Sequence, residues 1–119
     1  MAAARSSDQS HQLVGIQTLA GLDSPIAART LGENLSDPDT GVRESAVVSL
    51  MGQSGPDSVA ALSRALQDRD YSIRMMALDF LAQRGEEGAA SLYLASQHNE
   101  DPQVRSRARE LFDAMTRSD

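Results

Sequence analysis

The chain has 119 residues, of which 17 are acidic and 11 are basic, so its formal net charge at pH 7 is −6. This acidic balance argues against binding to nucleic acid or to anionic membrane surfaces, because both interactions depend on basic groups. The absence of cysteine excludes disulfides, thiolate metal sites and a cysteine nucleophile, and the longest apolar runs are too short for a membrane span.

The first segment in chain order, residues 1–7, is predicted to be a flexible linker. It is polar apart from three alanines and lacks the apolar stretch of a secretory signal. A repeat domain is predicted over residues 8–119, because aspartates recur there at a constant spacing of 31 residues. These aspartates are Asp8, Asp39, Asp70 and Asp101. Each is expected to cap a helix, and Asp101 gives the clearest signal, since Pro102 follows it at the first helical position.

Seven helices are predicted, and no alternating stretch is long enough for a half-buried strand. In chain order they cover residues 9–21, 25–35, 40–52, 56–67, 71–83, 87–97 and 102–116. The core faces predicted for the last three longer helices are Val42, Ala46, Ser49 and Leu50; Ile73, Ala77, Phe80 and Leu81; and Val104, Ala108, Leu111 and Phe112. The corresponding core positions of the shorter helices are Ala28, Leu31 and Leu35; Val59, Leu62 and Leu66; and Ala90, Tyr93 and Gln97. The predicted repeat units are 8–21, 24–52, 55–83 and 86–116.

One unit is defined by Leu66, Asp68, Ile73-Arg74, Ala77 and Leu81, and it returns twice with the same phase. This pattern resembles the HEAT-repeat family, and specifically its short-repeat subclass first noted in phycobilisome lyases. HEAT periods usually run to about 40–47 residues, whereas the short subclass shares the shorter period found here. The resemblance implies an all-α fold, namely a right-handed α–α superhelix of three to four repeats.

The resemblance also implies two columns of charged residues that face each other across adjacent units. Their members are Asp37 and Asp68 on one side and Arg43, Arg74 and Arg105 on the other. An arginine fork offers several donors to a carboxylate and to the carbonyls of a turn, so these columns are expected to tie the turns together as a structural ladder. The alternative is that the arginines bind an anionic ligand.

The helices that begin with Val-Arg or Ile-Arg line the concave side in the family that the chain resembles. The positions left exposed there form the predicted partner-binding face: Glu44, Val48, Met51, Met75, Asp79, Ala82, Glu110 and Asp113. This mixture of apolar and acidic groups suits a helix or peptide that carries Leu together with Arg or Lys. The alternative is that Met75 and Val48 pack between neighbouring helices.

The function predicted from these features is a non-catalytic scaffold that binds a partner protein or peptide of basic and apolar character. The alternative is an accessory subunit or enzyme of the chromophore-lyase type. No catalytic residue, metal ligand or cofactor is predicted, because the only histidines, His11 and His98, lie at opposite ends of the chain. Self-association through the exposed edge of helix 9–21 is a further expectation.

Overall fold

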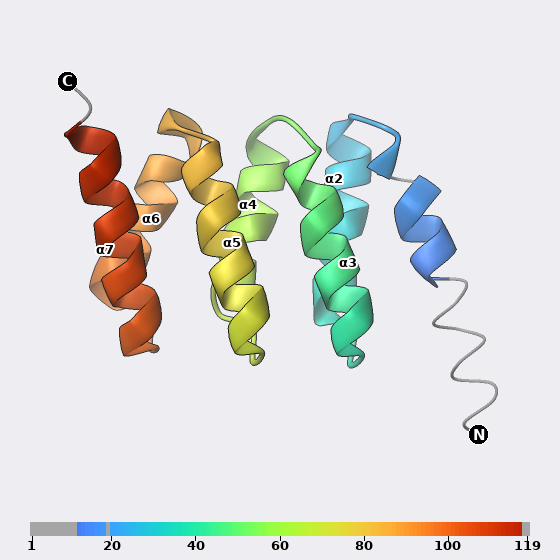
Figure 1. Ribbon diagram of the computed structural model, residues 1–119. Helices are drawn as coiled ribbons and strands as arrows, with labels where there is room; N and C mark the ends of the chain where they lie inside the picture. The colour runs from blue at the N-terminus through green and yellow to red at the C-terminus, as the bar shows by residue number, and fades with distance from the viewer. Residues whose placement is uncertain (1–11, 19, 118–119) are drawn as a thin grey trace. The chain divides into compact units, whose positions relative to one another are not determined.

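The computed structural model describes residues 12–18 and 20–117, and all regular secondary structure in these residues is helical (Figure 1). A first helical segment covers residues 12–18. The elements that follow are α2 (Pro25–Glu33), the 3-10 turn η1 (Asn34–Ser36), α3 (Thr40–Met51), α4 (Pro56–Ala65), α5 (Tyr71–Gln83), α6 (Glu86–His98) and α7 (Pro102–Thr116). The predicted all-α class is confirmed, and the bounds predicted for α2 to α7 differ from these by at most two residues.

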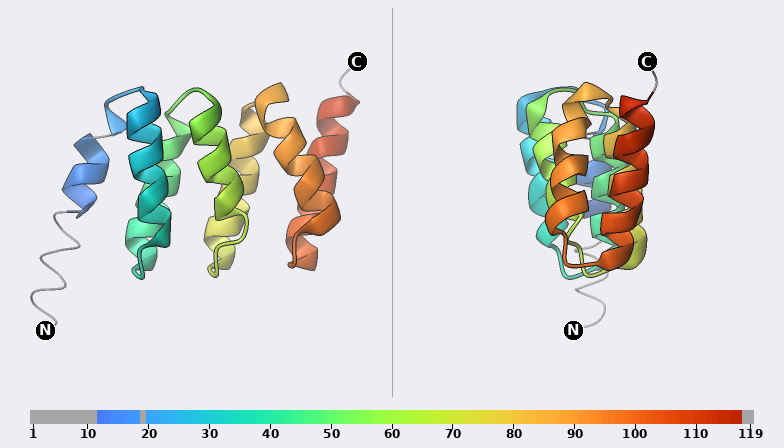
Figure 2. Two further views of the ribbon diagram at one scale, coloured as in Figure 1. Left: turned by 180° about the vertical axis from the view of Figure 1, so that it is seen from behind. Right: turned by 90° about the vertical axis from the view of Figure 1, so that its left-hand side faces the viewer.

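The chain divides into two compact units, Met1–Ala61 and Leu62–Asp119, and the division falls inside α4. In the first unit α2 packs against α3. In the second unit α6 contacts both α5 and α7, which also contact each other. Figures 1 and 2 show α5 and α7 in one layer of this unit and α6 in the other. The single repeat domain over residues 8–119 and the right-handed superhelix stay predictions.

The recurring aspartates cap helices, as predicted, wherever the structure describes them. Asp39 Oδ1 accepts a hydrogen bond from the backbone N–H of Val42 at 3.0 Å, and α3 begins directly after it. Asp70 and Asp101 occupy the same position before α5 and α7. Asp8 lies outside the described residues. The 31-residue period therefore marks the start of α3, α5 and α7.

The faces predicted for the longer helices supply a large part of the core. Their fully buried members in α3, α5 and α7 are Val42, Ala46, Leu50, Ile73, Ala77, Leu81, Val104 and Ala108, and Val47 and Leu78, outside the predicted faces, are fully buried too. The remaining predicted positions are only partly buried; they are Ser49, Phe80, Leu111 and Phe112. Burial of this aliphatic set supplies most of the stabilisation of each unit, since hydrophobic free energy scales with the apolar area removed from water.

The core face predicted for α6 is wrong. Ala90, Tyr93 and Gln97 are all exposed. The residues that α6 buries are Gly88, Leu92 and Ala95. The 31-residue step would place the start of this helix at residue 87, but it begins at residue 86, after a turn of two residues. No proline stands at that start as Pro56 does in α4, so the phase of the helix is free to move by one residue.

Small residues let the start of each shorter helix approach the end of the preceding one. Ser58 of α4 is fully buried, and its hydroxyl donates to the carbonyl oxygen of Leu50 at 2.7 Å. Gly88 of α6 takes the corresponding place, where a Cβ atom would overlap the carbonyl of Leu81. Gly85, with φ of +60°, makes the tight turn before it possible. Close helix approach in the second unit therefore depends on glycine at position 88.

Positions 78 and 81 of α5 differ in polarity from the equivalent positions 109 and 112 of α7. Leu78 and Leu81 are completely buried on α5. The positions 31 residues later on α7 hold Arg109, which is exposed, and Phe112, which is partly buried. The ring of Tyr93 packs against that of Phe112 with centroids 5.4 Å apart. The side of α7 that carries Arg109 and Phe112 is thus more polar than the side of α5 that carries Leu78 and Leu81.

Candidate functional site

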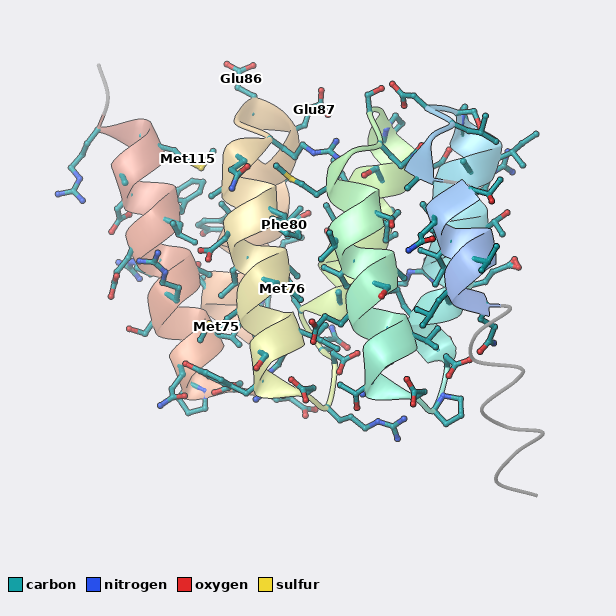
Figure 3. All side chains as sticks on the ribbon, turned by 45° about the vertical axis from the view of Figure 1, so that its right-hand side comes forward. Met75, Met76, Phe80, Glu86, Glu87 and Met115 are labelled. Carbon is teal, nitrogen blue, oxygen red and sulfur yellow. The ribbon has the colours of Figure 1, made fainter. Side chains whose placement is uncertain are left out.

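A groove runs between α5 and α7, the helices that begin with Ile73-Arg74 and Val104-Arg105. Its volume is about 400 Å³, and its lining residues are Tyr71, Met75, Asp79, Gln103, Ser106, Arg107 and Glu110. Figure 3 shows Met75 on the side of α5 that faces α7. Three residues of the predicted partner-binding face, Met75, Asp79 and Glu110, therefore come together in this α5–α7 groove.

Arg107 lies between two acidic side chains in the α5–α7 groove. Its Nη2 atom is 3.6 Å from Asp79 Oδ1, and its Nη1 atom is 3.3 Å from Glu110 Oε2. All three side chains are about half exposed, so each pair contributes at most about 1 kcal/mol to stability. The consequence is mainly electrostatic, since Arg107 balances part of the acidic charge expected on this face.

The other four lining residues of the α5–α7 groove, Tyr71, Gln103, Ser106 and Arg107, are not in the predicted partner-binding face. Gln103, Arg107 and Glu110 are spaced i, i+4 and i+7, which places them on one side of α7. That spacing was visible in the sequence. What the sequence lacked was the direction of the neighbouring helix α5.

A second groove lies in the first unit, between the helical segment 12–18 and α3. Its volume is about 330 Å³, and its lining residues are Leu13, Ile16, Gln17, Glu44, Ser45, Val48 and Ser49. Ile16 is buried at its base, whereas Val48 is 52% exposed. This α3 groove brings together Glu44 and Val48 of the predicted face.

The other three residues of the predicted face line neither groove. Met51 and Ala82 are partly buried near the C-terminal ends of α3 and α5. Asp113 Oδ2 lies 3.7 Å from Arg109 Nε, one helical turn earlier on α7. The structure thus assembles five of the eight predicted residues into two grooves.

The arginines of the predicted ladder bind the turn that precedes their own helix. Arg43, which is buried, donates from Nη1 to the carbonyl oxygen of Asp37 at 2.9 Å. Arg74 donates in the same way to Asp68 at 2.7 Å, and Arg105 donates to Asn99 at 2.6 Å. Each guanidinium thereby ties a turn to the first turn of the helix that follows it.

The carboxylates of Asp37 and Asp68 make a local turn. Asp37 Oδ1 accepts from the backbone N–H of Asp39, and Asp68 Oδ1 accepts from that of Asp70, both at 2.8 Å. Asn99 takes the same place in the third copy, since its Oδ1 accepts from Asp101 at 2.9 Å. A side-chain oxygen at this position is therefore what the repeated turn needs, and an amide supplies it as well as a carboxylate.

A second ion pair between consecutive repeats of the second unit joins Arg74 to Asp101. Arg74 Nη2 and Nε lie 3.0 and 3.1 Å from Asp101 Oδ2. The backbone N–H of Gln103 lowers the pKa of Asp101 from its ordinary value, and the hydrogen bond and charge of Arg74 add to this effect, while partial desolvation opposes it. The Arg74 guanidinium also lies 5.5 Å from the centre of the Tyr71 ring, at one end of the α5–α7 groove.

No group of three or more His, Cys, Asp or Glu side chains within residues 12–18 and 20–117 is placed to hold a metal ion. His98 is exposed and ends α6, and His11 lies outside the described residues. No helix in this part of the chain is long and apolar enough to cross a membrane.

Comparison with known protein families matches residues 50–112 to HEAT repeats. The matched segment is more than half of the chain and contains α4, α5, α6 and most of α7. It includes every residue that lines the α5–α7 groove. Comparison with curated proteins and with solved structures gave no match.

Proposed function

Because the chain belongs to the HEAT-repeat family, we propose that it is a non-catalytic module that binds a partner protein or peptide in the grooves beside α3 and between α5 and α7. HEAT repeats commonly mediate protein–protein interaction. The observation that carries the proposal is that both grooves expose apolar side chains. Val48 of α3 is 52% exposed and Tyr71 of α5 is 48% exposed, although each of these helices also buries a separate apolar face in the core.

The proposed partner-binding residues are those of the predicted face: Glu44, Val48, Met51, Met75, Asp79, Ala82, Glu110 and Asp113. Support is strongest for the five that line a groove. Their helices are anchored by caps and by arginine-bound turns, so a partner would not have to order them. Binding to a pre-ordered surface avoids much of the entropic cost of association.

We further propose a structural role for the ladder of Asp37, Asp68, Arg43, Arg74 and Arg105. Its support is that the arginines already use donors on backbone carbonyls of the turns. Assignment to the short-repeat subclass is likewise a proposal, supported by the 31-residue spacing of the caps. The chromophore-lyase alternative gains no support from the described residues, and self-association through the first helix stays a prediction.

The proposal is tested with two groove variants and two matched controls. Val48→Asp and Met75→Asp place a charge in the α3 groove and the α5–α7 groove respectively. Ala60→Asp and Ala90→Asp place the same charge on exposed positions of α4 and α6. Capture of a partner from an extract of the producing cells is expected to be lost with at least one groove variant and kept with both controls. Equal capture by all four proteins, with unchanged far-ultraviolet circular dichroism, would overturn the proposal.

A further inference from the structure

The two grooves correspond position by position along the repeat. Leu13 of the first helix and Met75 of α5 are 62 residues apart, which is twice the 31-residue period. The same offset relates four further pairs of lining residues: Gln17 with Asp79, Glu44 with Ser106, Ser45 with Arg107, and Val48 with Glu110. The grooves therefore share one architecture and differ in the side chains that fill it.

The difference is one of charge. The α5–α7 groove holds Asp79 and Glu110, and Arg107 pairs with both. At the corresponding places the α3 groove holds Gln17, Val48 and Ser45, which are all uncharged. Among the described residues, Glu44 is then the only charged one that lines the α3 groove, and none of these residues forms an ion pair with it. One groove carries its own cation, whereas the other presents an unbalanced carboxylate.

The carboxylate lies beside an apolar surface. Glu44 and Val48 are four residues apart on α3, so their side chains neighbour each other at about 5–6 Å between Cβ atoms. Leu13 and the buried Ile16 complete the apolar side of the groove. In a mostly apolar groove, a small number of charged groups fixes the orientation of a bound segment.

We infer that the α3 groove selects a helical peptide with an apolar side chain and an Arg or Lys one turn away from it. The apolar side chain packs on Leu13 and Val48, and the cation pairs with Glu44. This inference rests on the proposed function and names the chemistry of the partner. An acidic peptide is repelled at Glu44, and the α5–α7 groove does not select a cation in this way, because Arg107 already occupies its carboxylates.

The size of the preference for a cationic peptide follows from the solvent exposure of Glu44. Glu44 is exposed, so its pair with a peptide cation is worth about a two- to five-fold change in affinity at moderate salt. The apolar contact supplies the larger share of binding. The charge therefore sets the preference between peptides that carry the same apolar side chain. This preference weakens as salt screens the charge.

The probes are two synthetic helical peptides in an alanine-rich background, each with one central leucine. In the first an arginine follows the leucine by four residues, and in the second a glutamine stands in its place. Binding to the full chain is followed by fluorescence anisotropy and by amide shifts of Gln17, Ser45 and Val48. We expect shifts at these amides, a two- to five-fold preference for the arginine peptide, and loss of that preference in Glu44→Gln but not in the matched variant Glu87→Gln, which neutralises an exposed acid of α6 outside both grooves.

The outcomes separate the inference from the proposed function. An unchanged preference in Glu44→Gln, or amide shifts confined to the α5–α7 groove, overturns the inference and leaves the proposed function in place. Absence of any shift in the α3 groove at millimolar peptide also overturns it. Failure of the proposed function is recognised separately, by unchanged partner capture in Val48→Asp and Met75→Asp.

Discussion

Arg74 and Asp101 meet at 3.0 Å between Nη2 and Oδ2, and they belong to consecutive repeats of the second unit. Arg74 also donates to the carbonyl oxygen of Asp68 in its own repeat. Asp101 in turn caps α7 by accepting from the backbone N–H of Gln103 at 2.8 Å. A single guanidinium thus connects the turn before α5 with the start of α7, and the first two predictions concern this connection.

Replacement of Arg74 by alanine is expected to destabilise the protein by about 1–3 kcal/mol, because a charge-assisted hydrogen bond to the turn is lost. Arg74→Lys should recover only part of this loss, since an ammonium group cannot reproduce the planar fork. Thermal unfolding followed by circular dichroism measures both effects. Arg64→Ala, at an exposed position of α4, is the control. Equal melting temperatures for Arg74→Ala and Arg64→Ala would contradict a structural role.

The stability contributed by Asp101 is expected to depend on pH. Its pKa is lowered in the folded protein, so the contribution is fully present above the unfolded-state pKa and is lost as the pH falls through the folded-state pKa. Asn at this position still caps the helix but carries no charge. The melting temperatures of the wild type and of Asp101→Asn should therefore differ at neutral pH and converge in acid. A constant difference across that range would rule out this linkage.

Gly88→Ala is expected to destabilise the second unit by about 1–3 kcal/mol, because the added methyl group overlaps the Leu81 carbonyl. Helix propensity alone predicts the opposite sign, a gain of about 1 kcal/mol. Gly15→Ala provides the matched control, since no atom of the described residues beyond the local helix backbone lies within 4 Å of the Cβ position there. Urea unfolding of the two variants decides between packing and propensity. A stabilised Gly88→Ala protein would show that the close approach is not tight.

Asn99→Asp is expected to be destabilising by about 1–3 kcal/mol, although aspartate occupies the two equivalent positions. The buried Asn99 side chain donates from Nδ2 to the carbonyl oxygen of Leu66 at 3.0 Å. A carboxylate retains the turn but cannot donate, and it brings two acceptors together. Chemical denaturation measures the change, with the exposed variant Gln67→Glu as control. If Asn99→Asp matches the wild type, the amide has no special role.

The helix starts and the aliphatic core were predictable because both depend on the type and spacing of side chains. Asp39, Asp70 and Asp101 have the chemistry of caps, and the spacing of residues such as Val42, Ala46 and Leu50 identifies a buried face. The phase of α6 was not predictable from the period. It depends on a turn shortened at Gly85 and on the absence of proline, which allow the helix to begin one residue early.

The site was predicted only in part because its contacts depend on tertiary structure. The sequence placed Met75 and Asp79 on an exposed side of α5, but Arg107 reaches Asp79 only because α7 lies beside α5. Likewise, the columns of arginine and aspartate suggested carboxylate partners, and the structure adds the backbone carbonyls of the turns, to which Arg43 and Arg105 donate. Backbone acceptors are present in every turn, so no residue type in the sequence indicates which of them an arginine will bind.

The contrast between Leu78 and Arg109 shows that an equal period does not make successive repeats interchangeable. A further repeat placed after α7 would meet an exposed guanidinium at the position where α5 buries a leucine. Lengthening this protein by copying a repeat would therefore require Arg109 to be replaced by an aliphatic residue in the same step.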